Sequence, residues 1–256
     1  MSWDRGVVIK NETELALMRE AGRLNALALA TVRELIRPGI STAELDAAAE
    51  NVIRKNGGIP IFKGYPGAYP YPATLTISLN EELVHGIPSK RKLREGDIVS
   101  IDCGTLLDGF VGDSAFTMGV GKISEEAARL LEVTEQALYI GIEKMRKGNR
   151  TGDVSSAIQI FVESQGMFVT REYTGHGVGR NMHEGPQVPN YGTPGRGLEL
   201  RPGVTIALEP MVLIGTSLTS VKPDQWTVVS ADGSLTAHFE HTVAVTEGDP
   251  MILTLP

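Results

Sequence analysis

The centre of the chain reads Val99-Ser100-Ile101-Asp102-Cys103-Gly104-Thr105-Leu106-Leu107-Asp108-Gly109-Phe110-Val111-Gly112-Asp113. Two strand-like runs flank Asp108-Gly109, a dipeptide that strongly favours a two-residue hairpin turn. With this pair at the turn, Asp102 lies opposite Ala115. Asp113 then shares the face of Ala115, because side chains of a strand alternate between its two faces. The hairpin therefore predicts two neighbouring carboxylates on one face of a sheet.

Two more acidic residues stand in apolar surroundings. Glu209 directly follows the buried-strand run 204–208, and Glu240 lies within the run 237–245. A carboxylate in so apolar a stretch is costly unless it is paired or bound to a cation. A solvated face would explain the two hairpin acids taken alone, but it does not explain Glu209 and Glu240. Four carboxylates in strand-like segments are the ligands that a pair of hard divalent cations would need.

His176 is the histidine best placed to join these carboxylates. It lies in the glycine-rich segment 173–180, where we expect the glycines to let the backbone approach a ligand closely. The segment lacks the spacing of a phosphate-binding GxGxxG loop. One imidazole among carboxylates suits Mn, Fe, Co or Zn. His238 shares strand parity with Glu240 and could reach the same face, whereas His241 should face away; for both we favour a structural role.

The remaining pattern predicts pairs of helices followed by strands. Apolar residues recur at helical spacing from Leu15 to Leu35, and Ser41-Thr42-Ala43-Glu44 is typical of a capping box that opens a second helix. Residues 125–147 and 151–165 predict two more helices, and residues 74–79, 97–103 and 110–118 predict strands. Because strands follow each helix pair, the order favours an α+β architecture.

This order of elements occurs twice. The stretch from Gly39 to Gly57 aligns without gaps with the stretch from Gly148 to Gly166. Further on, the segment 85–88 (HGIP) resembles 183–186 (HEGP), and a glycine precedes both Asp102 and Glu209 by six residues. Four matches in one order predict two related halves of about 110–120 residues. The alternative is that the matches reflect only the common features of any two helix pairs. We expect a single catalytic domain over residues 1–256, with halves at about 12–120 and 121–249 and a site between them.

The amino-acid composition excludes several classes of protein. The chain has 256 residues, is 41% apolar and 21% charged, and carries a net charge of −7, which is ordinary for a globular protein and disfavours broad nucleic-acid binding. One cysteine, Cys103, excludes an internal disulfide and a multi-cysteine zinc site. No apolar run reaches the roughly 20 residues that span a bilayer, and residues 1–5 do not resemble a signal peptide. We therefore expect a soluble, cytoplasmic protein that binds neither DNA nor membranes.

From about residue 12 to residue 249 the chain resembles the methionine aminopeptidase family. Four family motifs match, at residues 80–88, 175–177, 209–211 and 239–242. The family's ordered ligand set of Asp, Asp, His, Glu and Glu matches Asp102, Asp113, His176, Glu209 and Glu240. The resemblance implies the pita-bread fold, whose two pseudo-symmetric halves of helices on a curved antiparallel sheet would account for the repeat.

Within the family the chain is similar to the short bacterial type I enzymes. Too few residues separate His183 from Glu209 for the helical insertion of type II, and the single cysteine excludes the zinc-finger extension of many eukaryotic members. Prolidase and aminopeptidase P share the ligand set but carry an added N-terminal domain, so X-Pro peptidase activity is the runner-up. A pita-bread binding module without catalysis is disfavoured because all five ligands are present. A mononuclear iron oxygenase would need two histidines.

The resemblance implies removal of the N-terminal methionine from nascent proteins whose second residue is small. Two divalent metal ions (Co, Mn, Fe or Zn), bridged by Asp113 and Glu240, would activate the water that attacks the first peptide bond. Glu209, besides binding metal, would pass a proton towards the leaving amine. His183 would stabilise the oxyanion, and His85 would contact the nitrogen of the scissile amide.

The resemblance also implies an apolar methionine pocket formed by Phe62, Tyr65 and Trp226. Phe62 and Thr76 stand where many bacterial relatives carry cysteines, and Met182 stands where a phenylalanine is common. Because such changes shift selectivity by only about 1–3 kcal/mol, we expect methionine to remain preferred. The stretch 66–73 is longer than usual and leaves two residues without assigned roles, Tyr69 and Tyr71.

The partners that the resemblance implies are nascent polypeptide N-termini, and the family is usually monomeric. Lys90-Arg91-Lys92 and Arg94 form a basic cluster in an otherwise acidic chain. We expect this cluster to be a solvated loop, with docking near ribosomal RNA as the alternative.

Overall fold

The computed structural model describes residues 6–256, so the expectation that residues 1–5 are not a signal peptide concerns residues outside the described ones. The helices are α1 (Glu12–Leu35), α2 (Thr42–Lys55), α3 (Glu125–Lys144) and α4 (Thr151–Ser164). The strands are β1 (Ile59–Pro60), β2 (Leu75–Leu79), β3 (Glu82–Val84), β4 (Ile98–Leu107), β5 (Phe110–Gly119), β6 (Phe168–Val169), β7 (Thr174–Gly177), β8 (Glu184–Pro189), β9 (Thr205–Leu208), β10 (Met211–Leu213), β11 (Thr219–Val221), β12 (Val228–Ser230), β13 (Thr236–His238), β14 (Glu240–Ala244) and β15 (Met251–Ile252). Among these described helices, none is long and apolar enough to cross a membrane.

The helices begin where local side-chain chemistry satisfies free backbone groups. At the start of α2, the Ser41 side chain accepts a hydrogen bond from the Glu44 backbone while the Glu44 side chain accepts one from the Ser41 backbone. This confirms the predicted capping box. The helix predicted over 125–147 ends three residues early, at Lys144, because Met145 leaves the helical conformation and buries its side chain completely.

The internal repeat is visible in the backbone. Helices α2 and α4 each contain 14 residues, and each begins three residues after a glycine, Gly39 or Gly148. A second glycine follows each helix, Gly57 or Gly166, and a short strand comes next, β1 or β6. All four glycines have φ between 77° and 92°, a conformation that side chains with a Cβ rarely adopt. The same local device therefore ends the helix pair in each half.

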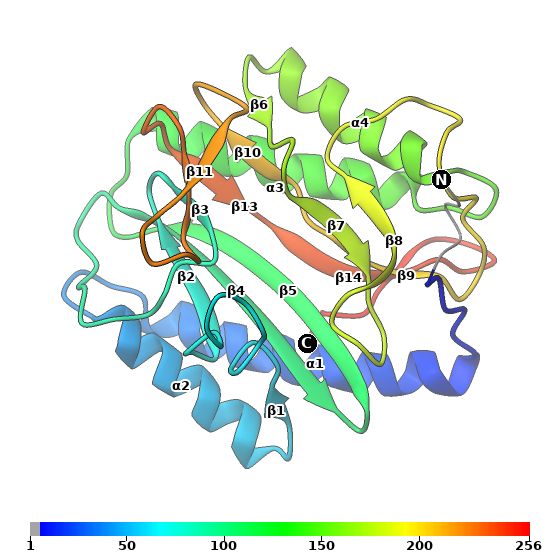
Figure 1. Cartoon of the computed structure of the whole chain (residues 1–256), viewed down its shortest axis with the longest axis horizontal. Helices are drawn as coiled ribbons and strands as arrows, with labels where there is room; N and C mark the ends of the chain where they lie inside the picture. Colours follow the sequence, from blue (N-terminus) through cyan, green and yellow to red (C-terminus); the bar gives the residue numbers. More distant parts are fainter. Residues whose placement is uncertain (1–5) are drawn as a thin grey trace.

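The strands form a curved antiparallel sheet that joins the halves. Within residues 6–256 the main sheet has nine strands in the order β1-β4-β5-β14-β9-β7-β8, with β2 beside β4 and β15 beside β14. Strand β5 of the first half pairs with β14 of the second. In Figure 1 the helices α1 and α2 lie along the lower side of the sheet and α3 and α4 along the upper side. Their apolar faces pack against the sheet and against each other to form the main core.

The predicted hairpin is confirmed in its register. Strands β4 and β5 pair antiparallel, with Leu107 opposite Phe110 and Asp102 opposite Ala115. The apolar run 237–245 is not one strand, as its sequence suggested, but two. Phe239 separates β13, which pairs with β10, from β14, which pairs with β9 and β5. The chain changes sheets at this residue, and its ring is buried in the core.

Candidate metal centre and active site

Strand pairing places three acidic residues on one face of the main sheet. Ala115 of β5 lies opposite Asp102 of β4 on one side and opposite Glu240 of β14 on the other. Asp113 is two residues from Ala115 and therefore points to the same face. The small side chain of Ala115 thus stands among three carboxylates at the centre of the sheet.

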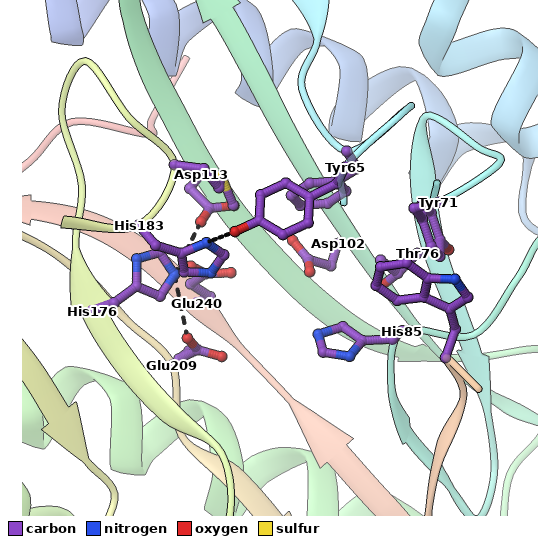
Figure 2. A pocket seen from close by; sticks show the side chains of 13 residues that line it. Tyr65, Tyr71, Thr76, His85, Asp102, Asp113, His176, His183, Glu209 and Glu240 are labelled. Atoms are coloured by element: carbon purple, nitrogen blue, oxygen red, sulfur yellow. Dashed lines mark hydrogen bonds and ion pairs between the residues drawn. The ribbon is translucent and has the colours of Figure 1, made fainter. Parts of the chain in front are cut away.

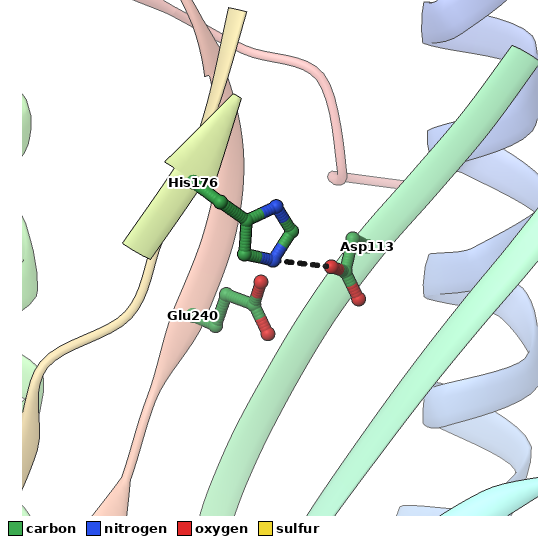
Figure 3. Close-up of side chains that lie close together, drawn as sticks. All are labelled: Asp113, His176 and Glu240. Carbon is green, nitrogen blue, oxygen red and sulfur yellow. Dashed lines mark ion pairs between the residues drawn. The ribbon is translucent and has the colours of Figure 1, made fainter. Parts of the chain in front are cut away.

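The neighbouring strands extend this acidic face. His176 of β7 pairs with Ala207 of β9, and Glu209 follows two residues after Ala207. Nε2 of His176 lies 3.7 Å from Oδ2 of Asp113 and 3.6 Å from Oε1 of Glu209. The side chains of Asp113, His176 and Glu240 converge from three strands, and each offers a ligand atom within 4.8 Å of the others (Figure 3). The five residues singled out in the sequence therefore lie together.

The glycines around His176 serve a different purpose from the one expected. A Cβ atom on Gly177 would lie 2.0 Å from the carbonyl oxygen of Gly185, and one on Gly175 would lie 2.8 Å from the carbonyl oxygen of Ala207. Neighbouring backbone, rather than a ligand, therefore occupies the space that these glycines leave. This close packing of β7 against its neighbours fixes the strand that carries His176.

The electrostatics of the cluster are those of crowded buried acids. Burial is the main cause that raises the pKa of each of the four carboxyls well above its ordinary value. The charge of Asp113 raises the pKa of Asp102 and Glu240 further. Burial lowers the pKa of His176 to about 3, so its imidazole is neutral and able to bind a metal.

Several oxygen atoms of the cluster lack a protein partner. Oδ1 of Asp102, Oδ1 of Asp113 and Oε1 of Glu240 are buried, and no described residue donates a hydrogen bond to them. A buried charged oxygen is costly unless a donor or a cation compensates it. Four carboxylates and one imidazole are a suitable donor set for divalent Mn, Fe, Co or Zn. The residues present therefore fit a divalent metal centre.

A cavity of about 140 Å³ adjoins the cluster. Its wall includes all three predicted pocket residues, Phe62, Tyr65 and Trp226, and also Tyr71, Thr76 and Met182 (Figure 2). Tyr71 is buried and donates a hydrogen bond to the carbonyl oxygen of Gly86 at 2.8 Å. Tyr69 is more exposed and donates to the carbonyl oxygen of Asp224 at 2.9 Å. Of the two tyrosines without assigned roles, Tyr71 therefore shapes the pocket.

Two further histidines border the cavity. His85 has a left-handed backbone conformation, with φ at 60°, which is uncommon for a residue with a Cβ and concentrates at functional sites. Burial lowers the pKa of His85 to about 4. Nδ1 of His183 lies 2.7 Å from the hydroxyl oxygen of Tyr65, and its ring centroid lies 4.2 Å from that of His176. Both histidines therefore lie next to the cavity and the acidic cluster (Figure 2).

His238 is a residue of this region that the sequence interpretation underrated. Its side chain is 2% exposed, and Nε2 lies 3.5 Å from Oε2 of Glu209 and 3.8 Å from Oε2 of Glu240. The strand parity that His238 shares with Glu240 was the signal in the sequence. His241 faces away, as expected, with Nδ1 2.8 Å from the hydroxyl oxygen of Thr254.

The chain is similar in sequence to known peptidases. The model of a protein family described as "Metallopeptidase family M24" matches residues 16–247. The methionine aminopeptidase of Clostridium acetobutylicum is 51% identical over 250 residues, which cover 97% of this chain and 99% of that protein. Methionine aminopeptidase 1 of Bacillus subtilis is 50% identical over 248 residues, which cover 97% of this chain and 99% of that protein.

The fold is also similar to solved structures. Methionine aminopeptidase from Thermotoga maritima superimposes with a TM-score of 0.95 at 46% identity, covering 98% of this chain and all of that one. Prolidase from Pyrococcus furiosus shares the fold, with a TM-score of 0.79 at 23% identity, covering 97% of this chain and 66% of that one. These likenesses confirm the expected pita-bread fold. With the family description spanning most of the chain and half of all positions identical in full-length relatives, this chain belongs to metallopeptidase family M24.

Proposed function

We propose that this chain is a metal-dependent aminopeptidase that hydrolyses the first peptide bond of polypeptides that begin with methionine and carry a small second residue. The observation that carries the proposal is the position of the acidic cluster, which adjoins a cavity with an apolar and aromatic wall. Methionine is an unbranched apolar side chain, and such cavities hold it by excluding water. The name of the two full-length relatives from Clostridium acetobutylicum and Bacillus subtilis supports the same activity.

We propose two divalent ions at the cluster, drawn from Co, Mn, Fe and Zn. Their ligands would be Asp102, Asp113, His176, Glu209 and Glu240. When bound, two such ions acidify a water molecule and polarise the scissile carbonyl group. Asp113 and Glu240 lie on the adjacent central strands β5 and β14, from which both side chains would help to hold the ions.

The side chains that would transfer a proton and stabilise the oxyanion lie in or beside the acidic cluster. Glu209 offers Oε1 beside His176, where it would accept a proton and pass it to the leaving amine. Tyr65 engages Nδ1 of His183. If the hydroxyl group donates this hydrogen bond, the neutral ring carries its proton on Nε2, which is the nitrogen that would stabilise the oxyanion. His85, which also lines the cavity, would contact the nitrogen of the scissile amide.

The proposal is tested with the metal-stripped protein, reconstituted with Mn, Fe or Co. Three peptides are compared side by side: Met-Ala-Ser, Met-Lys-Ser and an Ala-Pro peptide. Release of methionine from Met-Ala-Ser alone, abolished in the Asp102→Ala variant, is the expected result. Cleavage of the Ala-Pro peptide alone would assign the chain to the X-Pro peptidases. Tight metal binding without turnover of any peptide would favour a binding module.

We further propose that residues 1–256 form one catalytic domain that acts as a cytoplasmic monomer on nascent chains. Its basic cluster is exposed, and one member, Arg91, forms an ion pair with the buried Glu82 at 2.8 Å, which supports the solvated-loop interpretation. Sedimentation of the purified protein tests the monomer. Co-sedimentation with ribosomes tests docking, and loss of an observed association in a Lys90→Ala, Lys92→Ala variant would support it.

A further inference from the structure

The buried imidazole of His238 has no role in the reaction proposed above. The cavity wall includes Glu209 and Glu240, whereas His238 lies behind these carboxylates and is 2% exposed. Its Nε2 atom has no hydrogen-bond partner among the described residues. A buried nitrogen without a hydrogen-bond partner destabilises the fold unless it can form a hydrogen bond with one of the two carboxylates that it faces. Because His238 does not line the cavity, its effect on a bound substrate would pass through these carboxylates.

Glu209 lies between two imidazoles. Its Oε1 atom is 3.6 Å from Nε2 of His176, and its Oε2 atom is 3.5 Å from Nε2 of His238. Oxygen Oε1 therefore faces His176, a proposed metal ligand, and Oε2 faces His238. A ligand carboxylate of this kind needs a partner for its outer oxygen, because that partner sets the orientation of the inner one.

The two residues differ in how firmly the backbone holds them. Glu209 falls in the gap between strands β9 and β10, so no strand ladder fixes it. The backbone of His238 is tied to β5, because its N–H donates to the Thr117 hydroxyl at 3.0 Å and that hydroxyl donates to the His238 carbonyl at 2.7 Å. His238 is therefore a rigid support within reach of a carboxylate that has none of its own.

We propose that His238 is a positioning residue for the metal centre, which donates Nε2–H to Oε2 of Glu209 and so directs Oε1 of Glu209 to the metal. This inference rests on the proposed metal-dependent function. A neutral imidazole carries one N–H, and the carboxylate accepts it. The present 3.5 Å separation becomes a normal hydrogen bond after a side-chain shift of a few tenths of an ångström.

The test uses three variants of the full chain. His238→Phe keeps a ring but removes the N–H, His238→Gln restores a donor, and His241→Phe is the matched control three residues away on the opposite face. Calorimetric titration with Mn²⁺ and the visible absorption of the Co²⁺-loaded protein report the metal site directly. Thermal melts of the metal-free proteins verify that each variant folds, and kcat and KM on Met-Ala-Ser complete the comparison.

The expected result is a metal affinity at least about tenfold weaker in His238→Phe, with an altered Co²⁺ spectrum and a fall in kcat rather than a rise in KM. His238→Gln should regain most of the affinity, and His241→Phe should match the parent protein. Parental affinity and spectrum in His238→Phe would overturn the inference, and so would equal losses in the Phe and Gln variants. Because the metal readouts need no peptide turnover, a parent protein that binds metal but cleaves nothing would contradict only the proposed peptidase function.

Discussion

The hydroxyl oxygen of Tyr65 lies 2.7 Å from Nδ1 of His183, although 118 residues separate the two in sequence. The rings meet edge to face, with centroids 5.4 Å apart. Tyr65 belongs to the loop after β1 and His183 to the loop between β7 and β8. One hydrogen bond thus connects a pocket residue of the first half with a proposed catalytic residue of the second.

Tyr65→Phe removes this hydrogen bond and leaves the ring in the pocket. We expect kcat on Met-Ala-Ser to fall about fivefold, because a hydrogen bond of this kind contributes about 1 kcal/mol. The matched control is Tyr69→Phe, whose hydroxyl group donates instead to the carbonyl oxygen of Asp224. Steady-state kinetics measure kcat of both variants. Equal kcat values in Tyr65→Phe and Tyr69→Phe would contradict the role of Tyr65.

Trp226→Leu enlarges the cavity at its aromatic wall. The indole ring packs edge to face on Tyr71 with centroids 5.1 Å apart, and it closely covers the loop at Gly67. We expect KM for Met-Ala-Ser to rise about tenfold, since apolar pocket contacts contribute about 1–3 kcal/mol. The control is Tyr139→Leu, which replaces an aromatic ring that is 45% exposed on α3. An unchanged KM in Trp226→Leu would exclude this ring from the substrate pocket.

The stabilisation by added metal is expected to increase with pH. Burial raises the pKa of the four cluster carboxyls in the metal-free fold. A raised folded pKa stabilises the fold below the carboxyl's ordinary pKa of about 4, and this stabilisation is lost as pH rises through the folded value. A cation relieves the resulting repulsion and competes with fewer protons at high pH. Scanning calorimetry should therefore show a larger gain in Tm from Mn²⁺ at pH 8 than at pH 5.5.

Asp102→Asn gives the matched comparison for that experiment, because it removes one buried charge with little change in shape. Metal-free Asp102→Asn should melt at a higher temperature than the metal-free parent at pH 8 and should respond less to Mn²⁺. A gain from Mn²⁺ that is equal at both pH values would show that the carboxylates are not the groups that bind it.

Gly177→Ala tests the close approach of β7 and β8. The added Cβ atom would lie 2.0 Å from the carbonyl oxygen of Gly185, which is backbone and cannot turn aside. We expect the free energy of unfolding to fall by about 2 kcal/mol or more and metal affinity to fall with it, because β7 carries His176. Gly248→Ala, where a Cβ meets only one atom at 3.9 Å, is the control. Denaturant titration of both variants measures the difference.

Local chemistry made much of this protein predictable from its sequence. The capping box at Ser41 and Glu44 and the Asp108-Gly109 turn depend on neighbouring residues only, so the helix start and the hairpin register were readable directly. The hairpin register in turn determined that Asp102 and Asp113 share a face. The repeated glycines that end α2 and α4 identified the two halves for the same reason, since a left-handed backbone is a local requirement.

Tertiary structure decided what depends on packing between distant segments. The break at Phe239, the backbone contact at Gly177, the Tyr65–His183 hydrogen bond and the position of His238 behind Glu209 each join strands or loops far apart in the chain. No local pattern encodes such contacts, because their free energy comes from burial and from the partner that the fold supplies. The sequence by itself therefore determined which side chains are the candidate site residues, and the curved sheet determined how they are held together.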